Sequence, residues 1–433
     1  MKLAAALLLA LVTVPALPVR AQTAAQSPGE WVDARTGHRV VRISTAPGAA
    51  SLYFHQQSFT PQGDKMVVST AQGIFAVDLK SWKLSPIVGG EGLQLLFAGR
   101  RTRTVYYVRR SGPAPEIWSA DIDSGAARKI ADLPKGGIAT INADETLLAG
   151  AVEERPMPLQ PGMAGRDPRT DQAAFAANGP DGKPLTFAEA KEVRLDQRLE
   201  ARIPMEIFTI DIRTGERKTV YASTDWLNHL QFSPTDPGLL MFCHEGPWHK
   251  VDRIWTIRTD GSGLTKIHSR TMNMEIAGHE FWSPDGKTIW YDLQTPRGEV
   301  FWVAGYDLGT ARRRWYNVAR NAWSVHYNIS PDRRLFSGDG GDSEMVAHAP
   351  DGKWLYLFRP KAIPDVAGIH APDSESLIAP GTFESEKLVD MAKHDYRLEP
   401  NIHFTPDGKW MVFRSNMEGT NGIYAVEIAR AAP

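Results

Sequence analysis

The chain has 433 residues, of which 42 % are hydrophobic and 23 % are charged, and these proportions are typical of a folded globular protein rather than a disordered one. Its 49 basic and 50 acidic residues nearly balance, which excludes a strongly basic nucleic-acid-binding protein. The single cysteine excludes a disulfide framework, so stability must come from the core.

Residues 1–21 have the pattern of a secretory signal peptide. Lys2 supplies the positive start, an apolar run extends from Leu3 to Val14, and small residues at 19–21 form a cleavage site. No later stretch approaches the roughly 20 apolar residues of a membrane-spanning helix. We therefore expect residues 22–433 to be exported, periplasmic or secreted, with no membrane attachment after signal cleavage.

A turn that contains proline recurs along the chain, and a β-type run follows each copy. The strong copies are FTPQG at 59–63, FSPTD at 232–236, FWSPDG at 281–286, ISPD at 329–332 and FTPDG at 404–408. Positions 234, 284 and 331 lie 50 and 47 residues apart, the spacing of four-stranded propeller blades. With weaker copies near 101 and 143, seven units predict an all-β, seven-bladed β-propeller as a single domain over 22–433.

Three segments do not fit this repeat. HRVVRIS at 38–44 is a strand without a blade, and we expect it to close the ring beside GIYAVEIA at 422–429, because an open ring leaves unpaired strand edges. An insertion at about 152–202 contains helix-forming residues, which predict a helix at 187–201 over one mouth of the channel. The Pro- and Ser-rich stretch at 361–393 predicts an extended loop.

Polar side chains gather near the turn units of the later blades, where strand ends converge on a channel mouth. MFCHEGPWHKVDRIW places His244 at the end of an apolar strand, and GHEFWSPDG places His279 before the next turn unit. Glu399, Asn401 and His403 alternate in the last unit, so an extended strand would present them on one face. This mixed oxygen and nitrogen set suits manganese, another hard divalent ion or zinc. The alternative is that these groups only tie the blades together.

At these motifs the chain resembles the oligogalacturonate lyases, a polysaccharide lyase family with a seven-bladed propeller fold. The matching segments are TGHRVVRIS, YFHQQSFTPQGDKM, NHLQFSPTDPGLLMFCHEGPW, GHEFWSPDGKTIWYD and HFTPDGKWMVFRSN. The resemblance implies manganese-dependent β-elimination on short galacturonate chains, which is a step of pectin degradation. It also implies that His244 is the proton-abstracting base and that His279 is a metal ligand.

The chain departs from the family pattern in its last blade. The family has a His-Pro-His pair there, preceded by a glutamine ligand, whereas this chain has Glu399-Pro400-Asn401, with Tyr396 near the place of the glutamine. Either Glu399 and Asn401 bind a harder ion with the help of His403, or the metal is lost. The signal peptide is a second departure, since typical members of the family act in the cytoplasm.

Substrate-binding residues are expected from the same units. His326 and Asn328 precede the turn at 329–332, Arg253 and Arg202 are candidates for sugar carboxylates, and Trp248 for stacking on a sugar ring. Each is also compatible with a surface or packing role. Two other functions stay open: a non-catalytic TolB-like periplasmic propeller that binds a protein or glycan, and a lyase for another uronide.

Overall fold

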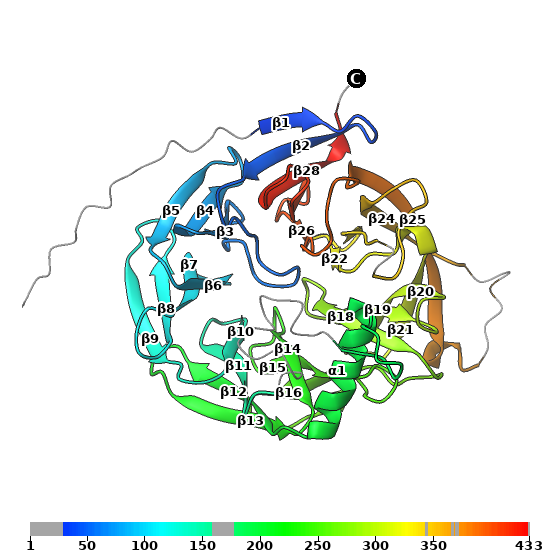
Figure 1. Cartoon of the computed structure of the whole chain (residues 1–433), viewed down its shortest axis with the longest axis horizontal. Helices are drawn as coiled ribbons and strands as arrows, with labels where there is room; N and C mark the ends of the chain where they lie inside the picture. The colour runs from blue at the N-terminus through cyan, green and yellow to red at the C-terminus, as the bar shows by residue number, and fades with distance from the viewer. Residues whose placement is uncertain (1–28, 158–176, 343–344, 365–367, 369–371, 432–433) are drawn as a thin grey trace, which may run out of the picture.

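The structure is a computed structural model that describes residues 29–157, 177–342, 345–364, 368 and 372–431. The expected signal peptide at 1–21 lies outside these residues, as does part of the insertion at 152–202. Short antiparallel sheets stand side by side around a central axis and close into a ring (Figure 1). No helix in the described ranges is long and apolar enough to cross a membrane.

The first four blades follow one another along the chain. Blade 1 contains β3 (Lys65–Thr70), β4 (Gly73–Asp78) and β5 (Leu84–Gly89). Blade 2 contains β6 (Leu93–Ala98), β7 (Thr104–Arg109), β8 (Glu116–Asp121) and β9 (Ala127–Asp132). Blade 3 contains β10 (Gly137–Ile141), β11 (Leu147–Glu153), β12 (Met205–Asp211) and β13 (Arg217–Ser223). Blade 4 contains β14 (Trp226–Phe232), β15 (Leu239–Glu245), β16 (Ile254–Arg258) and β17 (Thr265–Lys266).

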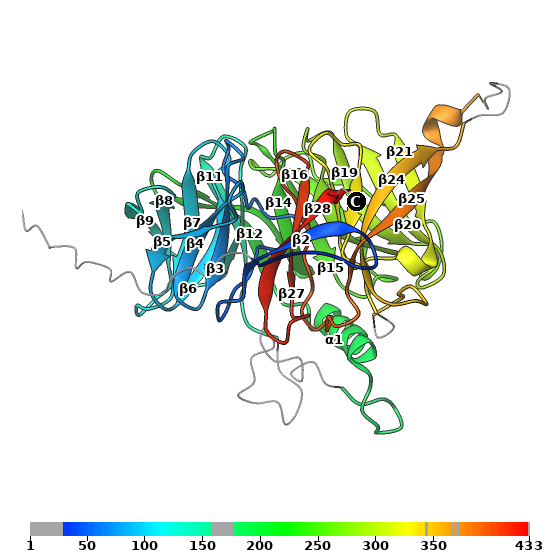
Figure 2. The same ribbon diagram turned by 90° about the horizontal axis from the view of Figure 1, so that it is seen from above.

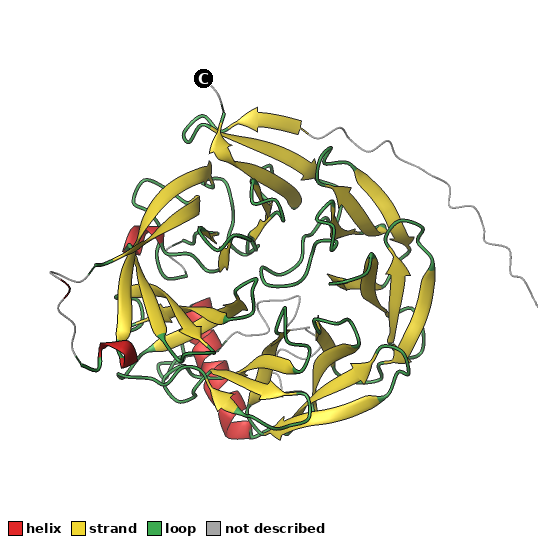
Figure 3. Cartoon of the chain, turned by 180° about the vertical axis from the view of Figure 1, so that it is seen from behind, coloured by secondary structure: helices red, strands yellow, loops and turns green. Residues whose placement is uncertain are grey.

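The last three blades complete the ring. Blade 5 contains β18 (Ile276–Trp282), β19 (Thr288–Gln294), β20 (Phe301–Asp307) and β21 (Arg313–Val318). Blade 6 contains β22 (Tyr327–Ile329), β23 (Phe336–Gly338), β24 (Trp354–Ala362) and β25 (Ile378–Asp390). Blade 7 contains β26 (His403–Phe404), β27 (Trp410–Ser415) and β28 (Gly422–Arg430). Short 3₁₀ turns occur at Arg320–Ala322 and Ser374–Ser376. The all-β, seven-bladed prediction is confirmed, and strands dominate Figure 3.

The predicted turn units join the first and second strands of their blades. In blade 5 the Ser283 hydroxyl donates to Asp285 at 2.6 Å, and the Ser283 N–H bonds to the carbonyl of Thr288 at 2.8 Å. Gly286 has φ of +68°, a conformation that glycine adopts without a steric cost. The same local chemistry recurs in blade 7, where Thr405 donates to Asp407. These turns all lie at one end of the ring, which we call the proline mouth.

Strand β2 (His38–Ser44) closes the ring as predicted. It pairs antiparallel with β28 and carries β1 (Gly29–Val32) on its outer edge, so the first and last parts of the described chain share one sheet. Val40, Tyr424 and Val426 are buried in the core beneath this junction. The pairing covers the outer edge of β28, while β26 remains the strand of blade 7 nearest the axis.

The predicted helix is confirmed as α1 (Phe187–Ala201), between β11 and β12. Thr186 and Glu189 form a capping box that satisfies the first backbone donors of the helix. Figure 2 shows α1 beneath the ring at one end. The loop from β15 to β16 lies at the same end as α1. Both connect the second and third strands of a blade, whereas the proline turns connect the first and second strands at the opposite end. We call the end that carries α1 the helix mouth.

The extended loop predicted at 361–393 is wrong for its second half. Residues 378–390 form β25, which pairs antiparallel with β24 and also parallel with β21 of blade 5. Pro380 and Gly381 disfavour a strand locally, but hydrogen-bonding partners on both sides outweigh that preference. Blades 5 and 6 therefore share one eight-stranded sheet.

Ring closure predicts the result of a truncation. A chain that starts at Ala46 lacks β1 and β2, exposes the edge of β28 and uncovers Tyr424 and Val426, so its unfolding midpoint should fall strongly or its unfolding should lose cooperativity. Denaturant unfolding followed by tryptophan fluorescence measures this. A chain that starts at Gly29 is the control and should unfold like the full chain. Equal midpoints for both truncations would contradict a structural role for β2.

Candidate active site

A loop from blade 7 to blade 1 enters the channel and occupies its axis (Figure 1). We call residues 52–57 the plug. Phe54 is 1 % exposed, and its ring stacks on His326 with centroids 4.6 Å apart. Three side chains hold the plug backbone: Asn401 Oδ1 accepts from the Phe54 N–H at 3.1 Å, Asn328 Nδ2 donates to the Phe54 carbonyl at 2.8 Å, and His403 Nε2 lies 3.0 Å from the Leu52 carbonyl.

These bonds correct part of the predicted ligand set. Glu399, Asn401 and His403 do not share one extended face, because Asn401 has φ of +50° and β26 begins only at His403. Asn401 also donates to the Glu399 carbonyl at 3.1 Å. Asn401 and His403 therefore anchor the plug, as does Asn328. Burial lowers the pKa of His403 to about 4, so its ring is neutral at pH 7.

On the side of the helix mouth, His326 lies at the centre of a cluster of ionisable side chains. Its Nδ1 lies 2.8 Å from Asp339, while its Nε2 lies 3.1 Å from the Tyr53 hydroxyl and 3.8 Å from Glu399. The His279 ring meets it edge to face, with centroids 4.8 Å apart. Burial acts to lower the pKa of His326, but the Asp339 carboxylate outweighs it and raises the pKa. The structure therefore brings His279, His326 and Glu399 together, and we call them the His326 group.

The Arg253 guanidinium lies buried between two carboxylates of neighbouring blades. Its Nε is 3.2 Å from Glu280, and its Nη1 is 3.7 Å from Glu245. Burial alone would raise the pKa of Glu245, yet the charge of Arg253 lowers it to about 2. Arg253 is therefore neutralised within the protein, which does not favour its predicted role in binding a sugar carboxylate.

His229 and His279 occupy equivalent places in blades 4 and 5, each five residues before the turn proline. Both have φ of +49° and interrupt the pairing register of β14 and β18. A β-bulge of this kind re-aims a side chain, and the left-handed conformation costs about 1 kcal/mol or more for a non-glycine residue. Burial lowers the pKa of both rings, so both are neutral ligands or acceptors at pH 7.

His244 lies on the opposite face of β15 from Glu245. Its Nδ1 is 2.9 Å from Asp225, whose other oxygen is 2.9 Å from the Arg202 guanidinium. The ring packs against Tyr221 and Trp255, and its Nε2 is buried without a hydrogen-bond partner. This arrangement leaves one ring nitrogen unoccupied next to a narrow cavity that Arg253 also lines.

The remaining candidates take different positions. Trp248 is half-buried beside the same narrow cavity, beneath the Arg297 guanidinium at 5.7 Å from its ring. Arg202 ends α1 and uses its charge on Asp225. Asp225, His229 and Asp339 were missed from the sequence. A signal existed only for His229, which precedes Pro234 by the same five residues that separate His279 from Pro284.

A cavity of about 710 Å³ lies on the other side of the plug, toward the proline mouth. Its lining includes the turn prolines, and Asn328 and His403 border it. The plug thus separates this space from the buried ionisable residues. Chemistry that needs His244 and the His326 group must take place on the side of the helix mouth.

The comparisons with known proteins fit this architecture. This chain is a polysaccharide lyase of the propeller type. It belongs to the oligogalacturonate lyase family, because residues 181–432, more than half of the chain, match the sequence model of that family.

Curated relatives and solved structures match over nearly the full length. An oligogalacturonide lyase of Pectobacterium atrosepticum is 25 % identical over 92 % of this chain and 95 % of its own, and an oligogalacturonate lyase of Dickeya dadantii is 24 % identical over the same shares. An oligogalacturonate lyase solved in complex with manganese has a TM-score of 0.70 at 22 % identity, covering 93 % of this chain and 96 % of its own. An oligogalacturonate lyase of Vibrio parahaemolyticus also has a TM-score of 0.70 at 22 % identity, covering 94 % and 99 %.

A buried carboxyl group near the site predicts a pH-dependent stability. Asp292 on β19 is 2 % exposed, its Oδ1 has no partner, and burial raises its pKa from 3.8 to about 7. The folded protein therefore holds this proton more tightly than the unfolded chain, so stability falls as the pH rises from about 4 to about 7. Asp292→Asn should remove this loss and exceed the wild type at pH 8 by about 4 kcal/mol.

Denaturant unfolding in the presence of a chelator, at pH values from 4 to 8, measures this difference. The exposed substitution Asp132→Asn is the control and should follow the wild type throughout. A difference between Asp292→Asn and the wild type that stays constant over this range would show that Asp292 does not carry the perturbed proton.

Proposed function

We propose that the chain is an exported, metal-dependent lyase that cleaves uronate-containing oligosaccharides by β-elimination, as in the degradation of pectin fragments. Family membership supports the reaction class. The observation that carries the proposal is the His244–Asp225 pair, with Nε2 of His244 buried and without a partner. The pattern of residues 1–21 supports export to the periplasm or the medium.

His244 has the arrangement of a general base. The Asp225 carboxylate accepts the Nδ1 proton, which leaves the lone pair of Nε2 to take the C5 proton of a uronate. Electrons from the C5–H bond then form a C4–C5 double bond, and the C4–O bond breaks with its electron pair on the leaving oxygen. No water is consumed. Arg202 on the second oxygen of Asp225 holds the carboxylate in place.

We place the divalent ion of this proposal at the His326 group. The solved relative described above was determined in complex with manganese. His279 fits the role of a ligand because its Nδ1 is buried without a hydrogen-bond partner, and Glu399 supplies an oxygen near His326. Such an ion would neutralise the charge that builds on the substrate carboxylate as the C5 proton leaves. Asn401 and His403 do not join this set, because the plug occupies their polar atoms.

Helix α1 supplies positive charge at the helix mouth. Lys191 is exposed, and its charge acts on His229, Glu245 and His279. The helix is held to the propeller by ion pairs of Glu192 with Arg297 and of Asp196 with Lys250. Lys191 is therefore better placed than Arg253 to bind a further carboxylate of an oligouronide.

Substitutions of the pair test the base. With oligogalacturonate and manganese, the wild type should produce the ultraviolet absorbance of an unsaturated uronide. His244→Ala should lower kcat about 100-fold or more, the range for loss of a general base. Asp225→Asn should lower kcat about tenfold and change the pH profile of kcat/KM, because the ring loses the carboxylate that fixes its tautomer.

His249→Ala is the matched control, since His249 is exposed in the same loop and should leave activity unchanged. A panel of galacturonate- and glucuronate-containing oligomers identifies the uronide. Folded wild-type protein that releases no unsaturated product from any of them would refute the lyase proposal and favour a binding propeller instead. Full activity of His244→Ala would refute this residue as the base.

A further inference from the structure

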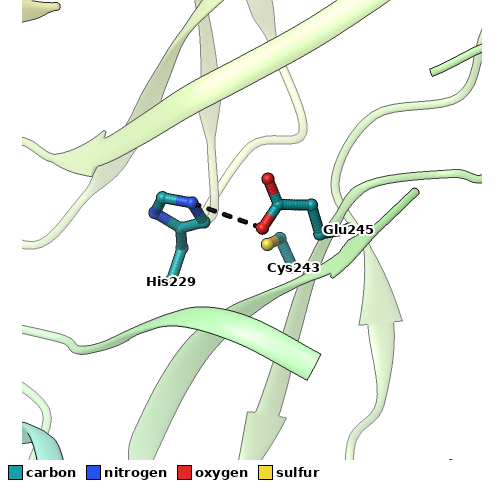
Figure 4. A group of neighbouring side chains, drawn as sticks. All are labelled: His229, Cys243 and Glu245. Atoms are coloured by element: carbon teal, nitrogen blue, oxygen red, sulfur yellow. Dashed lines mark ion pairs between the residues drawn. The ribbon is translucent and has the colours of Figure 1, made fainter. Parts of the chain in front are cut away.

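Three potential ligands converge on blade 4, apart from the His326 group. One ring nitrogen of His229, the Cys243 Sγ and a Glu245 carboxylate oxygen all lie within 4.8 Å of one another. Figure 4 shows the three side chains turned toward the same space, with His229 Nε2 and Glu245 Oε2 joined at 3.7 Å. Cys243 is fully buried, whereas His229 and Glu245 are partly accessible.

The backbone explains the convergence. Cys243 and Glu245 are two residues apart on β15 and share one face, and Asn228 of β14 pairs with Cys243 on that face. In a regular strand His229 would point away from this face. The bulge in β14 and the φ of +49° at His229 turn it back toward Cys243. A strained residue that brings three donors together is a feature of ligand sites.

The charge of the surroundings favours a cation. Glu245 and Glu280 contribute two negative charges, and Arg253 between them contributes one positive charge. Asn228 Nδ2 donates to Glu245 Oε2 at 2.7 Å and orients this carboxylate. The two carboxylates and the guanidinium therefore sum to one net negative charge before any ion binds. The exposed Lys191 adds a positive charge that acts on His229 and Glu245 from α1. In a buried site the net negative charge of the two carboxylates and the guanidinium attracts a divalent cation more strongly than it would in water.

The donor types select the kind of ion. Thiolate and imidazole favour zinc-type ions, whereas manganese prefers oxygen ligands. The geometry points to a zinc-type divalent-cation site formed by His229, Cys243 and Glu245, with a fourth position open to water or a substrate oxygen. Ligands of a tetrahedral zinc ion lie roughly 3.5 Å apart, so the present group, whose atoms lie within 4.8 Å of one another, must contract by rotation of the His229 and Glu245 side chains to hold the ion. Binding releases the thiol proton to solvent.

Cobalt provides a direct test, because Cys243 is the only cysteine of the chain. Metal-free full-length protein is titrated with CoCl₂ and its absorption spectrum recorded. We expect a thiolate-to-cobalt charge-transfer band in the near ultraviolet, which ZnCl₂ displaces. Cys243→Ser should abolish the band, and His229→Gln and Glu245→Gln should each weaken zinc affinity at least tenfold in calorimetry. A cobalt-loaded wild type without a thiolate band would overturn the site.

Two variants complete the design. His394→Gln is the matched control, since this buried histidine lies in the connection from blade 6 to blade 7, where it bonds Ser415 and the Leu398 carbonyl, and should leave the band unchanged. His279→Gln should also keep the band, and its loss there would show that the two groups form one site and overturn the separate assignment. The spectrum requires no substrate, so the result is independent of lyase activity.

Discussion

The hydrogen bonds that hold the plug on the propeller axis determine the rest of the site. Peptide groups at the centre of a ring have no strand to pair with, and each buried group without a partner costs about 1 to 3 kcal/mol. Asn328, Asn401 and His403 supply those partners from blades 6 and 7. With the plug in place, the channel is divided, and Tyr53 and Phe54 form an aromatic wall against His326, with the Tyr53 hydroxyl at its Nε2. Burial then perturbs the ionisable groups on that side.

Three blades share an unusual backbone conformation at or just before their inner strands. His229, His279 and Asn401 occur at corresponding places in three blades, and all three have φ near +50°. A propeller needs only regular inner strands to close, so this conformation is not required by the fold. In blade 7 the left-handed residue is an asparagine that binds the plug, while in blades 4 and 5 histidines occupy the same place. The same left-handed backbone conformation thus lets Asn401 bind the plug in blade 7, whereas in blades 4 and 5 it orients a histidine ring nitrogen.

The sequence predicts the parts of the molecule that depend on local patterns. Proline turns, strand composition and helix-forming residues located the blades, β2 and α1, because each signal lies within a few residues. The site was less predictable. Alternation placed Glu399, Asn401 and His403 on one face, but the φ of Asn401 breaks the alternation. Asp225 precedes His244 by nineteen residues and belongs to another strand connection, so no local pattern pairs them. Strand β25 was missed because its partners are distant in sequence.

Strand β15 separates two kinds of chemistry. Its one face presents His244 to Asp225, and its other face presents Cys243 and Glu245 to Arg253. The carboxylate on each face already has its own cation, Asp225 with Arg202 and Glu245 with Arg253, so the strand keeps two separate ion pairs apart. Glu245 ends β15, and the loop that follows it is tied to α1 by the ion pair of Lys250 with Asp196. The two groups therefore lie on either side of one strand end, and the positive charge of Lys191 on α1 also acts on Glu245 there.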